Sequence, residues 1–225
     1  MSKGANLEIM DIFLRKENLK EFVLSYPITT LLIVADLVAY FGVVIISMTD
    51  KGAAADIFNN YIFDGQMIGK GEWYRLITGN FLHIGIAHLL FNVFATYVFA
   101  PFLEKILGKV KFLLCYLLLG IGTGTLNYLM NPFFLGVGAS GALFGLMGIY
   151  IFICIGKPTF FSKETKQGIF GLVATSLLSG FLFENVGWLG HLGGLISGVL
   201  LGILLVFLMP QLFSSDDTNV ESSIH

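Results

Sequence analysis

The sequence predicts an all-α polytopic membrane protein, a bundle of six transmembrane helices with a long interfacial loop between the first and second. Of its 225 residues, 56% are hydrophobic and 12% are charged, whereas ordinary soluble domains carry about 25% charged residues. The mean hydropathy is +0.82. The charges are unevenly placed and leave repeated apolar runs of about 20 residues, each long enough to cross a bilayer core.

The apolar runs define six spans and two flanking segments. The predicted spans are Ile28–Met48, Phe81–Leu103, Val110–Leu129, Ser140–Ile155, Gly168–Phe183 and Trp188–Met209. Pro27 opens the first span, so the membrane domain covers residues 27–209. Residues 1–26 form either a short surface helix or a solvated segment, and they lack the pattern of a cleaved signal peptide. Residues 210–225 form a polar, acidic tail.

A long segment, residues 49–80, separates the first two spans. It is polar at first and then rich in aromatic residues, and it contains Glu72-Trp73-Tyr74-Arg75. Loops of this length are usually functional or disordered. Because Trp and Tyr prefer the membrane–water interface, we expect a structured element that lies at that interface.

Positive charge predicts the orientation in the cell membrane. Six spans place both termini on one side, and ten of the 13 basic residues lie on that side. They are Lys3, Arg15, Lys16, Lys20, Lys105, Lys109, Lys111, Lys157, Lys163 and Lys166. Cytoplasmic loops carry an excess of Lys and Arg. We therefore expect cytoplasmic termini and an outer location for the long loop.

Composition also argues against several classes of partner and cofactor. No basic stretch indicates nucleic-acid binding. Cys115 and Cys154 both lie in apolar runs, where cysteine behaves as a small hydrophobic residue. Neither a disulfide framework nor a cysteine metal site is supported. We expect no cofactor, and the bilayer itself is the first predicted partner.

Ser140 is a candidate nucleophile because it follows a small-residue turn and begins a short span. The 16 residues from Ser140 to Ile155 rise about 24 Å as a helix, against about 30 Å of hydrocarbon. Ser140 should therefore lie below the outer surface. Helix-terminal N–H groups beside it could stabilise an oxyanion. The alternative is an N-cap serine on a helix that serves only packing.

His191 is the candidate base. Histidine is rare within membrane spans and is a functional candidate there. Glycines recur every four residues along its span, at Gly190, Gly194, Gly198 and Gly202, and the Ser140 span carries Gly141 and Gly145. Small-residue ridges let helices approach closely, so Ser140 and His191 could meet at the outer end of such a contact. Serine beside imidazole is the minimal activated nucleophile. A structural histidine is the alternative.

Two further polar residues of the second span share one helical face. His88 and Asn92 are four residues apart, and both can donate hydrogen bonds to an oxyanion. His83 falls on another side of that helix, and we expect it to hold the loop or a water molecule. A metal site of His83, His88 and His191 is the alternative, but the chain has no His-Glu-x-x-His pattern.

Asp36 lies near the middle of the first span. A buried acid is costly there unless it faces a polar interior. It is either a third catalytic group or, as we expect, the donor or acceptor of a structural hydrogen bond to another helix.

Four segments together resemble the rhomboid intramembrane serine proteases over residues 72–202. They are Glu72-Trp73-Tyr74-Arg75, Phe81-Leu82-His83-Ile84-Gly85-Ile86-Ala87-His88-Leu89-Leu90-Phe91-Asn92, Gly138-Ala139-Ser140-Gly141-Ala142, and Gly190-His191-Leu192-Gly193-Gly194 with Gly198. The resemblance implies a six-helix rhomboid-like bundle.

The resemblance also implies roles for these residues. Ser140 would be the nucleophile and His191 the general base and acid, with no required aspartate. The oxyanion hole would consist of His88, Asn92 and the backbone N–H of Ser140. Supporting roles would fall to Gly138, beside the substrate carbonyl, and to Trp73 and Arg75, which would anchor the first loop.

Two positions depart from the family pattern. Tyr74, rather than tryptophan, precedes Arg75. Phe144 stands one turn after Ser140, where some members carry a tyrosine against the histidine, and its ring could still stack there.

We therefore expect an intramembrane serine endopeptidase that cleaves transmembrane protein substrates near the outer membrane face through an acyl-enzyme. Substrates should carry small residues or helix breakers, and access beside the fifth span is implied by the resemblance and by that span's shortness. One alternative is a catalytically silent relative that binds membrane helices. Another is a proton transporter using His83, His88, His191 and Asp36, although no inverted repeat is evident.

Overall fold

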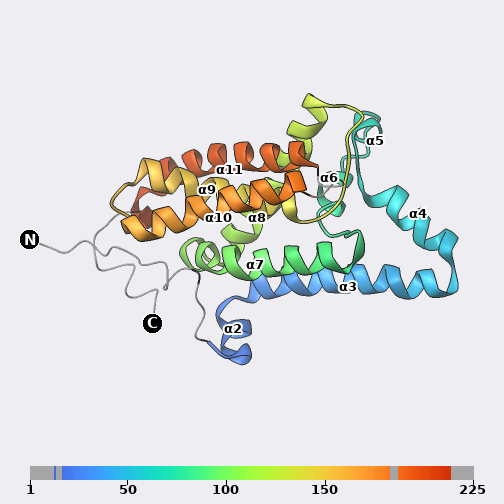
Figure 1. Ribbon diagram of the computed structural model, residues 1–225, viewed down its shortest axis with the longest axis horizontal. Coiled ribbons are helices and arrows are strands. Elements are labelled where there is room, and N and C mark those ends of the chain that lie inside the picture. The colour runs from blue at the N-terminus through green and yellow to red at the C-terminus, as the bar shows by residue number, and fades with distance from the viewer. Residues whose placement is uncertain (1–12, 14–16, 183–186, 214–225) are drawn as a thin grey trace, which may run out of the picture.

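The computed structural model describes residues 13, 17–182 and 187–213. The fold is a bundle of helices, in which α3 runs beside α7 and α11 beside α9 (Figure 1). The long helices are α3 (Pro27–Thr49), α7 (Gly85–Leu107), α8 (Lys109–Met130), α9 (Ser140–Gly156), α10 (Lys163–Leu182) and α11 (Trp188–Leu208).

The long helices agree with the predicted spans. Within the described ranges, four of them, α3, α7, α8 and α11, are long and apolar enough to cross a membrane, and α9 is a shorter apolar helix. The protein is therefore a multi-pass membrane protein. Each predicted span overlaps one long helix, although Phe183, at the end of the fifth, lies outside the described residues. The number of spans and the orientation of the termini stay predictions.

The shorter elements lie between and around these helices. They are α2 (Leu19–Ser25), α4 (Lys51–Tyr61), β1 (Phe63–Asp64), α5 (Gly65–Gly69), α6 (Arg75–Thr78), β2 (Leu135–Gly136) and the 3₁₀ helix η1 (Pro210–Phe213). Asn18 and Glu21 form a capping box at the start of α2, which satisfies backbone donors there. Most of residues 1–26 and of the predicted tail lie outside the described residues.

Helix α9 is the central helix of the bundle. Twelve of its 17 residues are buried, whereas α3 buries only Thr29, Leu32 and Asp36. Tyr150 of α9 is fully buried and donates a hydrogen bond of 2.9 Å to the carbonyl of Phe99 in α7. The outward side of α3 is apolar and exposed, as expected for a helix that faces lipid.

The N-terminus of α3 is held by a carboxylate from the end of α7. Glu104 is buried and accepts hydrogen bonds from the backbone N–H of Ile28 and of Thr29, both at 2.8 Å. The Thr29 hydroxyl donates a third, at 2.7 Å. The first N–H groups of a helix have no partner within the helix. An acidic group satisfies them and complements the helix dipole.

Two expectations about the second span are wrong in detail. Helix α7 begins at Gly85, not at residue 81, because Gly85 has φ +79° and Ile84 is extended. His83 consequently lies in the preceding loop rather than on the helix. At the other end, only Gly108 separates α7 from α8, so the lysines assigned to that loop lie on helix ends.

The expected hydrogen bond from Asp36 to another helix is also wrong for the part of the chain that the structure describes. Asp36 is 1% exposed, and neither carboxylate oxygen has a hydrogen-bond partner there. The hydroxyl of Tyr116 on α8 is likewise buried without a partner. Asp36 thus provides no visible link between helices.

The predicted interfacial loop is largely helical, and it is fastened to the turn before α9. Strand β1 pairs antiparallel with β2, with Phe63 opposite Gly136 and Asp64 opposite Leu135. The N–H of Gly65 donates to the carbonyl of Phe134 at 2.9 Å. Main-chain hydrogen bonds therefore tie the first loop to the segment that leads into Ser140.

Candidate active site

Ser140 is the first residue of α9 and follows a turn that only glycine adopts without strain. Gly138 has φ +105°, a conformation that costs glycine little because it has no Cβ. Its N–H donates to the carbonyl of Gly79 at 2.8 Å. Gly138 and Ala139 are buried, and Ser140 is half-buried. The turn thus presents Ser140 from a fixed backbone.

The same turn lies directly against His88 and Asn92. A Cβ on Gly138 would lie 2.7 Å from His88 Cε1, 2.8 Å from His88 Nε2 and 3.7 Å from Asn92 Nδ2. Real Cβ atoms essentially never approach closer than 3.0 Å. A side chain at position 138 would therefore displace the His88 ring, in addition to the strain of the positive φ.

The hydrogen bonds of His88 and Asn92 leave donors on the side of that turn. The N–H of Ile84 lies 3.4 Å from His88 Nδ1 and donates to it, which assigns the imidazole proton to Nε2. Asn92 is buried, and its Nδ2 donates to the carbonyl of His88 at 2.8 Å. An amide carries two hydrogens, so one remains for another acceptor.

His191 lies in the first turn of α11, with its ring against α9. It is 7% exposed. Its imidazole stacks on the ring of Phe144, with centroids 4.0 Å apart and planes 16° apart. Phe144 thus stacks as its position predicts. Among the described residues, His191 Nδ1 has no hydrogen-bond partner, so stacking rather than a carboxylate orients the ring.

Helices α9 and α11 touch through glycine, as the spacing of the ridges predicts. A Cβ on Gly194 would collide with the carbonyl oxygen of Gly141, and one on Gly198 with that of Gly145. Gly148, which the ridge argument missed, lies against the backbone of α11 in the same way. Gly190 differs from the prediction and faces Asn127 of α8 instead.

Residues 70–207 match the family model of the Rhomboid domain, which is more than half of the chain. The chain belongs to the rhomboid family. YdcA of Bacillus subtilis (strain 168), whose name assigns it provisionally to the rhomboid proteases, is 36% identical over 198 residues, covering 87% of this chain and 96% of YdcA.

Two further relatives are named as rhomboid proteases. GluP of Bacillus subtilis is 36% identical over 135 residues, which is 60% of this chain and 26% of GluP. GlpG of Haemophilus influenzae is 29% identical over 138 residues, which is 59% of this chain and 70% of GlpG.

In this rhomboid, Arg75 fastens the first loop. Its buried guanidinium donates to Glu72 at 2.7 Å and to the carbonyls of Asn59 and Ile62 at 2.8 and 3.3 Å, which closes the C-terminal end of α4. Tyr74 also donates to Glu72, at 3.0 Å. The hydrogen bonds from Arg75 and Tyr74 lower the pKa of Glu72.

Trp73 stands apart from this anchor. Its side chain is 59% exposed, on a segment that we expect at the membrane interface. Glu72 accepts hydrogen bonds from Arg75 and from Tyr74. Tyr74, the residue that departs from the family pattern, therefore takes part in the anchor.

His83 supports His88 from the side. It is 2% exposed, and its ring lies edge-on to that of His88, with centroids 5.1 Å apart. Its Nδ1 lies 3.2 Å from the carbonyl of Phe81. No group of three or more His, Cys, Asp or Glu side chains in the described ranges could hold a metal ion.

Proposed function

We propose that this rhomboid is an intramembrane serine endopeptidase with a Ser140–His191 dyad. One observation carries the proposal, namely the stacking of His191 on Phe144. Phe144 is four residues after Ser140, and residues so spaced share one face of a helix. The imidazole therefore lies at the helix end that begins with Ser140. The names of the relatives support the same activity.

In the proposed reaction, Ser140 Oγ attacks the scissile carbonyl carbon while His191 takes its proton. The tetrahedral intermediate collapses, the protonated imidazole gives its proton to the leaving amine, and an acyl-enzyme remains. His191 then deprotonates a water molecule that attacks the ester, and Ser140 leaves with the returned proton.

Three N–H donors would stabilise the oxyanion. The backbone N–H of Ser140 is at a helix start, where such groups have no intrahelical partner. His88 offers Nε2–H because its Nδ1 accepts from Ile84. Asn92 offers its second amide hydrogen. Donors fixed around the developing charge contribute more than donors that must reorient, and Gly138 leaves the room in which they can converge.

The base has no carboxylate partner in the part of the chain that the structure describes. In serine proteases with a triad, an aspartate orients the histidine through Nδ1. Here Phe144 holds the ring instead, and a two-residue dyad is the simplest mechanism that fits. Asp36 takes no part in this proposal.

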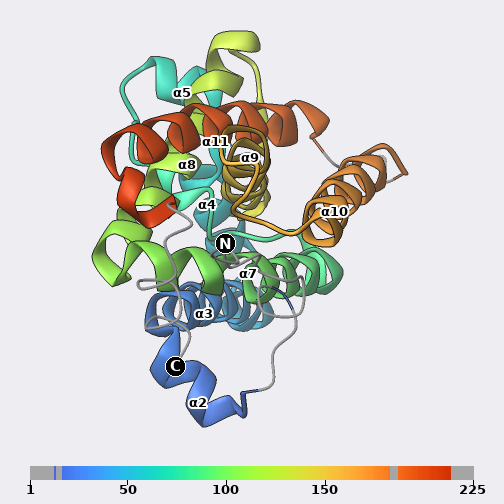
Figure 2. The same ribbon diagram turned by 90° about the vertical axis from the view of Figure 1, so that its left-hand side faces the viewer.

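Substrate would reach the dyad from the membrane beside α10. In Figure 2, α10 stands at the margin of the bundle. In residues 163–178, where burial is described, its buried side chains are Thr165, Ile169 and Val173, spaced at four along a single stripe. A transmembrane substrate hides its carbonyls in helical hydrogen bonds, so it must unwind first. We therefore infer cleavage near the outer face of the cell membrane, at small or helix-breaking residues, with both termini of the enzyme cytoplasmic.

The test combines cleavage with labelling. Purified Ser140→Ala and His191→Ala are compared with wild type and with Thr49→Ala, a control that removes an exposed hydroxyl at the end of α3. The substrate is a membrane protein with a destabilised transmembrane helix, and a fluorophosphonate reports the reactive serine. We expect both dyad variants to lose cleavage and Ser140→Ala to lose labelling, while Thr49→Ala keeps both.

Substitutions of the oxyanion donors give a graded result. Asn92→Ala and His88→Ala should lower the cleavage rate by about 10- to 1,000-fold. Full cleavage by a folded Ser140→Ala or His191→Ala variant would overturn the dyad. A wild type that neither cleaves nor labels, yet binds membrane helices, would instead favour a silent relative.

A further inference from the structure

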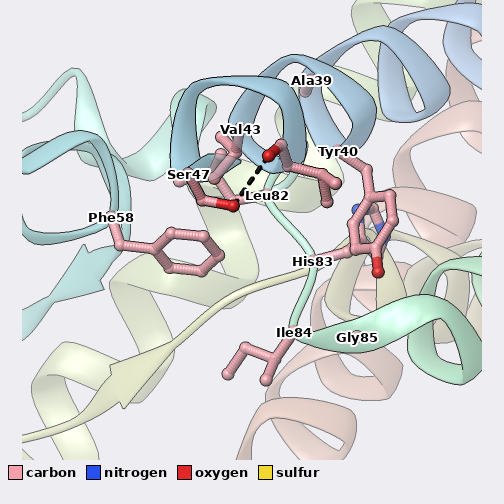
Figure 3. A pocket seen from close by; sticks show the side chains of 10 residues that line it. Ala39, Tyr40, Val43, Ser47, Phe58, Leu82, His83, Ile84 and Gly85 are labelled. Carbon is pink, nitrogen blue, oxygen red and sulfur yellow. Dashed lines mark hydrogen bonds between the residues drawn. The ribbon is translucent and has the colours of Figure 1, made fainter. Parts of the chain in front are cut away.

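The described part of the chain contains a hollow that neither Ser140 nor His191 lines. It is a cavity of about 200 Å³ between α3, α4 and the segment just before α7 (Figure 3). Figure 3 shows Tyr40 and His83 at one end and Ser47 and Phe58 at the other. No role in the proposed chemistry involves α3 or α4, and the cavity adjoins the candidate active site through His83, which lines it.

Most of the wall of the cavity suits an apolar occupant, and its polar side chains are Tyr40, Ser47 and His83. Most of the lining is aliphatic or aromatic, including Ala39, Val43, Phe58 and Leu82. The hydroxyl of Ser47 is already committed, since it donates to the carbonyl of Val44 at 2.7 Å. An engineered apolar cavity of about 150 Å³ stays dry and binds benzene. This pocket is half open, and its volume of about 200 Å³ has room for one aromatic ring or a short hydrocarbon chain.

One wall of the cavity is also the segment that orients His88. Leu82, His83, Ile84 and Gly85 line it. The N–H of Ile84 donates to His88 Nδ1, and the ring of His83 contacts that of His88. A shift of this wall would therefore change both the tautomer-fixing hydrogen bond and the ring contact.

The junction of this wall with α7 is a glycine with no neighbour packed against its Cβ position. Gly85 has φ +79°, and nothing lies within 4 Å of the position its Cβ would occupy. A residue with this backbone freedom can absorb a change in direction of the chain. Residues 82–85 are thus held by the contacts of His83 and Ile84 with His88, whereas no neighbour packs against the Cβ position of Gly85.

We propose that this cavity is a binding site for a small apolar molecule, a single aromatic ring or a short alkyl chain, and that its occupancy shifts His88. The effect on catalysis rests on the proposed oxyanion role of His88, whereas binding and the movement of His88 do not. An occupant that displaces the wall by a fraction of an ångström would alter turnover without touching the dyad.

The binding test uses bromobenzene and histidine ¹⁵N resonances. The chain has four histidines, so the His88 ring signals can be assigned by substitution. Wild-type protein in lipid nanodiscs is titrated with bromobenzene beside Ala39→Leu, which fills the cavity, and Val38→Leu, which alters the neighbouring side chain that is 66% exposed. We expect a saturable shift of the His88 signal in wild type and Val38→Leu, and none in Ala39→Leu.

A tethered ring keeps the test decisive if Ala39→Leu fails to fold. Ser47→Cys is treated with benzyl methanethiosulfonate, which places one ring in the cavity, or with methyl methanethiosulfonate, which adds only a methyl. Val38→Cys is the matched control on the exposed side of α3, and both native cysteines are buried. We expect only the benzyl adduct at position 47 to move the His88 signal and to change the cleavage rate, by about 3- to 100-fold.

Each other outcome has a defined meaning. Equal shifts in Ala39→Leu and wild type would overturn the site, and so would failure of the benzyl reagent to modify Ser47→Cys while it modifies Val38→Cys. A moved His88 signal with an unchanged cleavage rate would overturn the regulatory role. If wild type cleaves nothing yet the His88 signal moves, the site stands and the proposed protease activity fails.

Discussion

Gly198→Ala is the sharpest test of the contact between α9 and α11. The added Cβ would collide with the carbonyl oxygen of Gly145 and lie 2.7 Å from its carbonyl carbon. Relieving the contact with the carbonyl carbon alone, to the 3.4 Å at which ordinary van der Waals contact begins, needs about 0.7 Å of helix separation, and the oxygen, which lies closer, needs more. Overpacking of this kind costs about 1–3 kcal/mol. Because α11 also carries His191, the same separation displaces the proposed base, and a misplacement near 1 Å can lower the rate by about 100-fold.

The matched control is Gly42→Ala in α3, where nothing lies within 4 Å of the added Cβ. The free energy of unfolding is measured by SDS titration in mixed micelles, and the cleavage rate is measured at a temperature where both variants stay folded. We expect Gly198→Ala to lose stability and activity, and Gly42→Ala to match or slightly exceed wild type, since alanine favours the helix. Equal stability and equal rates for the two variants would show that the helices are not held at backbone contact.

Three further predictions concern single side chains. Phe144→Ala should leave Ser140 labelling by a fluorophosphonate detectable but slow it, because the stack that orients His191 is gone; unchanged kinetics would contradict that role. Glu104→Gln should lower the free energy of unfolding by about 1–3 kcal/mol, since an amide N–H₂ cannot accept the donors of α3, and hydrogen exchange should rise at the start of that helix. The lowered pKa of Glu72 means that its contact with Arg75 is complete above the ordinary glutamate pKa and is lost only as pH falls through the lowered value. A Trp188→Phe background, read by Trp73 fluorescence, should show this acid transition, and Glu72→Gln should abolish it.

The spans were predictable because the bilayer imposes their length and composition. A run of about 20 apolar residues has few stable alternatives in lipid, and each predicted span overlaps a long helix. Their starts were less predictable. Hydropathy counts residues 81–84 with the second span, but the positive φ of Gly85 delays the helix. A glycine's φ follows from tertiary contacts, which composition does not report.

The site could be predicted where spacing alone decides the geometry. Glycines four apart on two spans predict a close contact, and the structure has that contact at Gly194 and Gly198. Gly148 was missed because it breaks the four-residue interval. The expected partner of Asp36 was wrong. The expectation assumed that a buried acid is paired, and both oxygens of Asp36 are buried without a hydrogen-bond partner among the described residues.

The first loop belongs to the candidate site through its backbone. Arg75 closes α4 on the carbonyls of Asn59 and Ile62, strand β1 follows directly and pairs with β2, and Gly138 donates to the carbonyl of Gly79 from the same loop. Main-chain hydrogen bonds depend on backbone position rather than on side-chain identity. The turn before Ser140 is therefore positioned from two sides, by α9 behind it and by a loop whose side-chain anchor, Arg75, lies well before it in the chain. An anchor of this kind can fix the position of Ser140, the proposed nucleophile, without contacting it. That role would account for a buried arginine with several hydrogen bonds in a segment that we expect at the membrane surface.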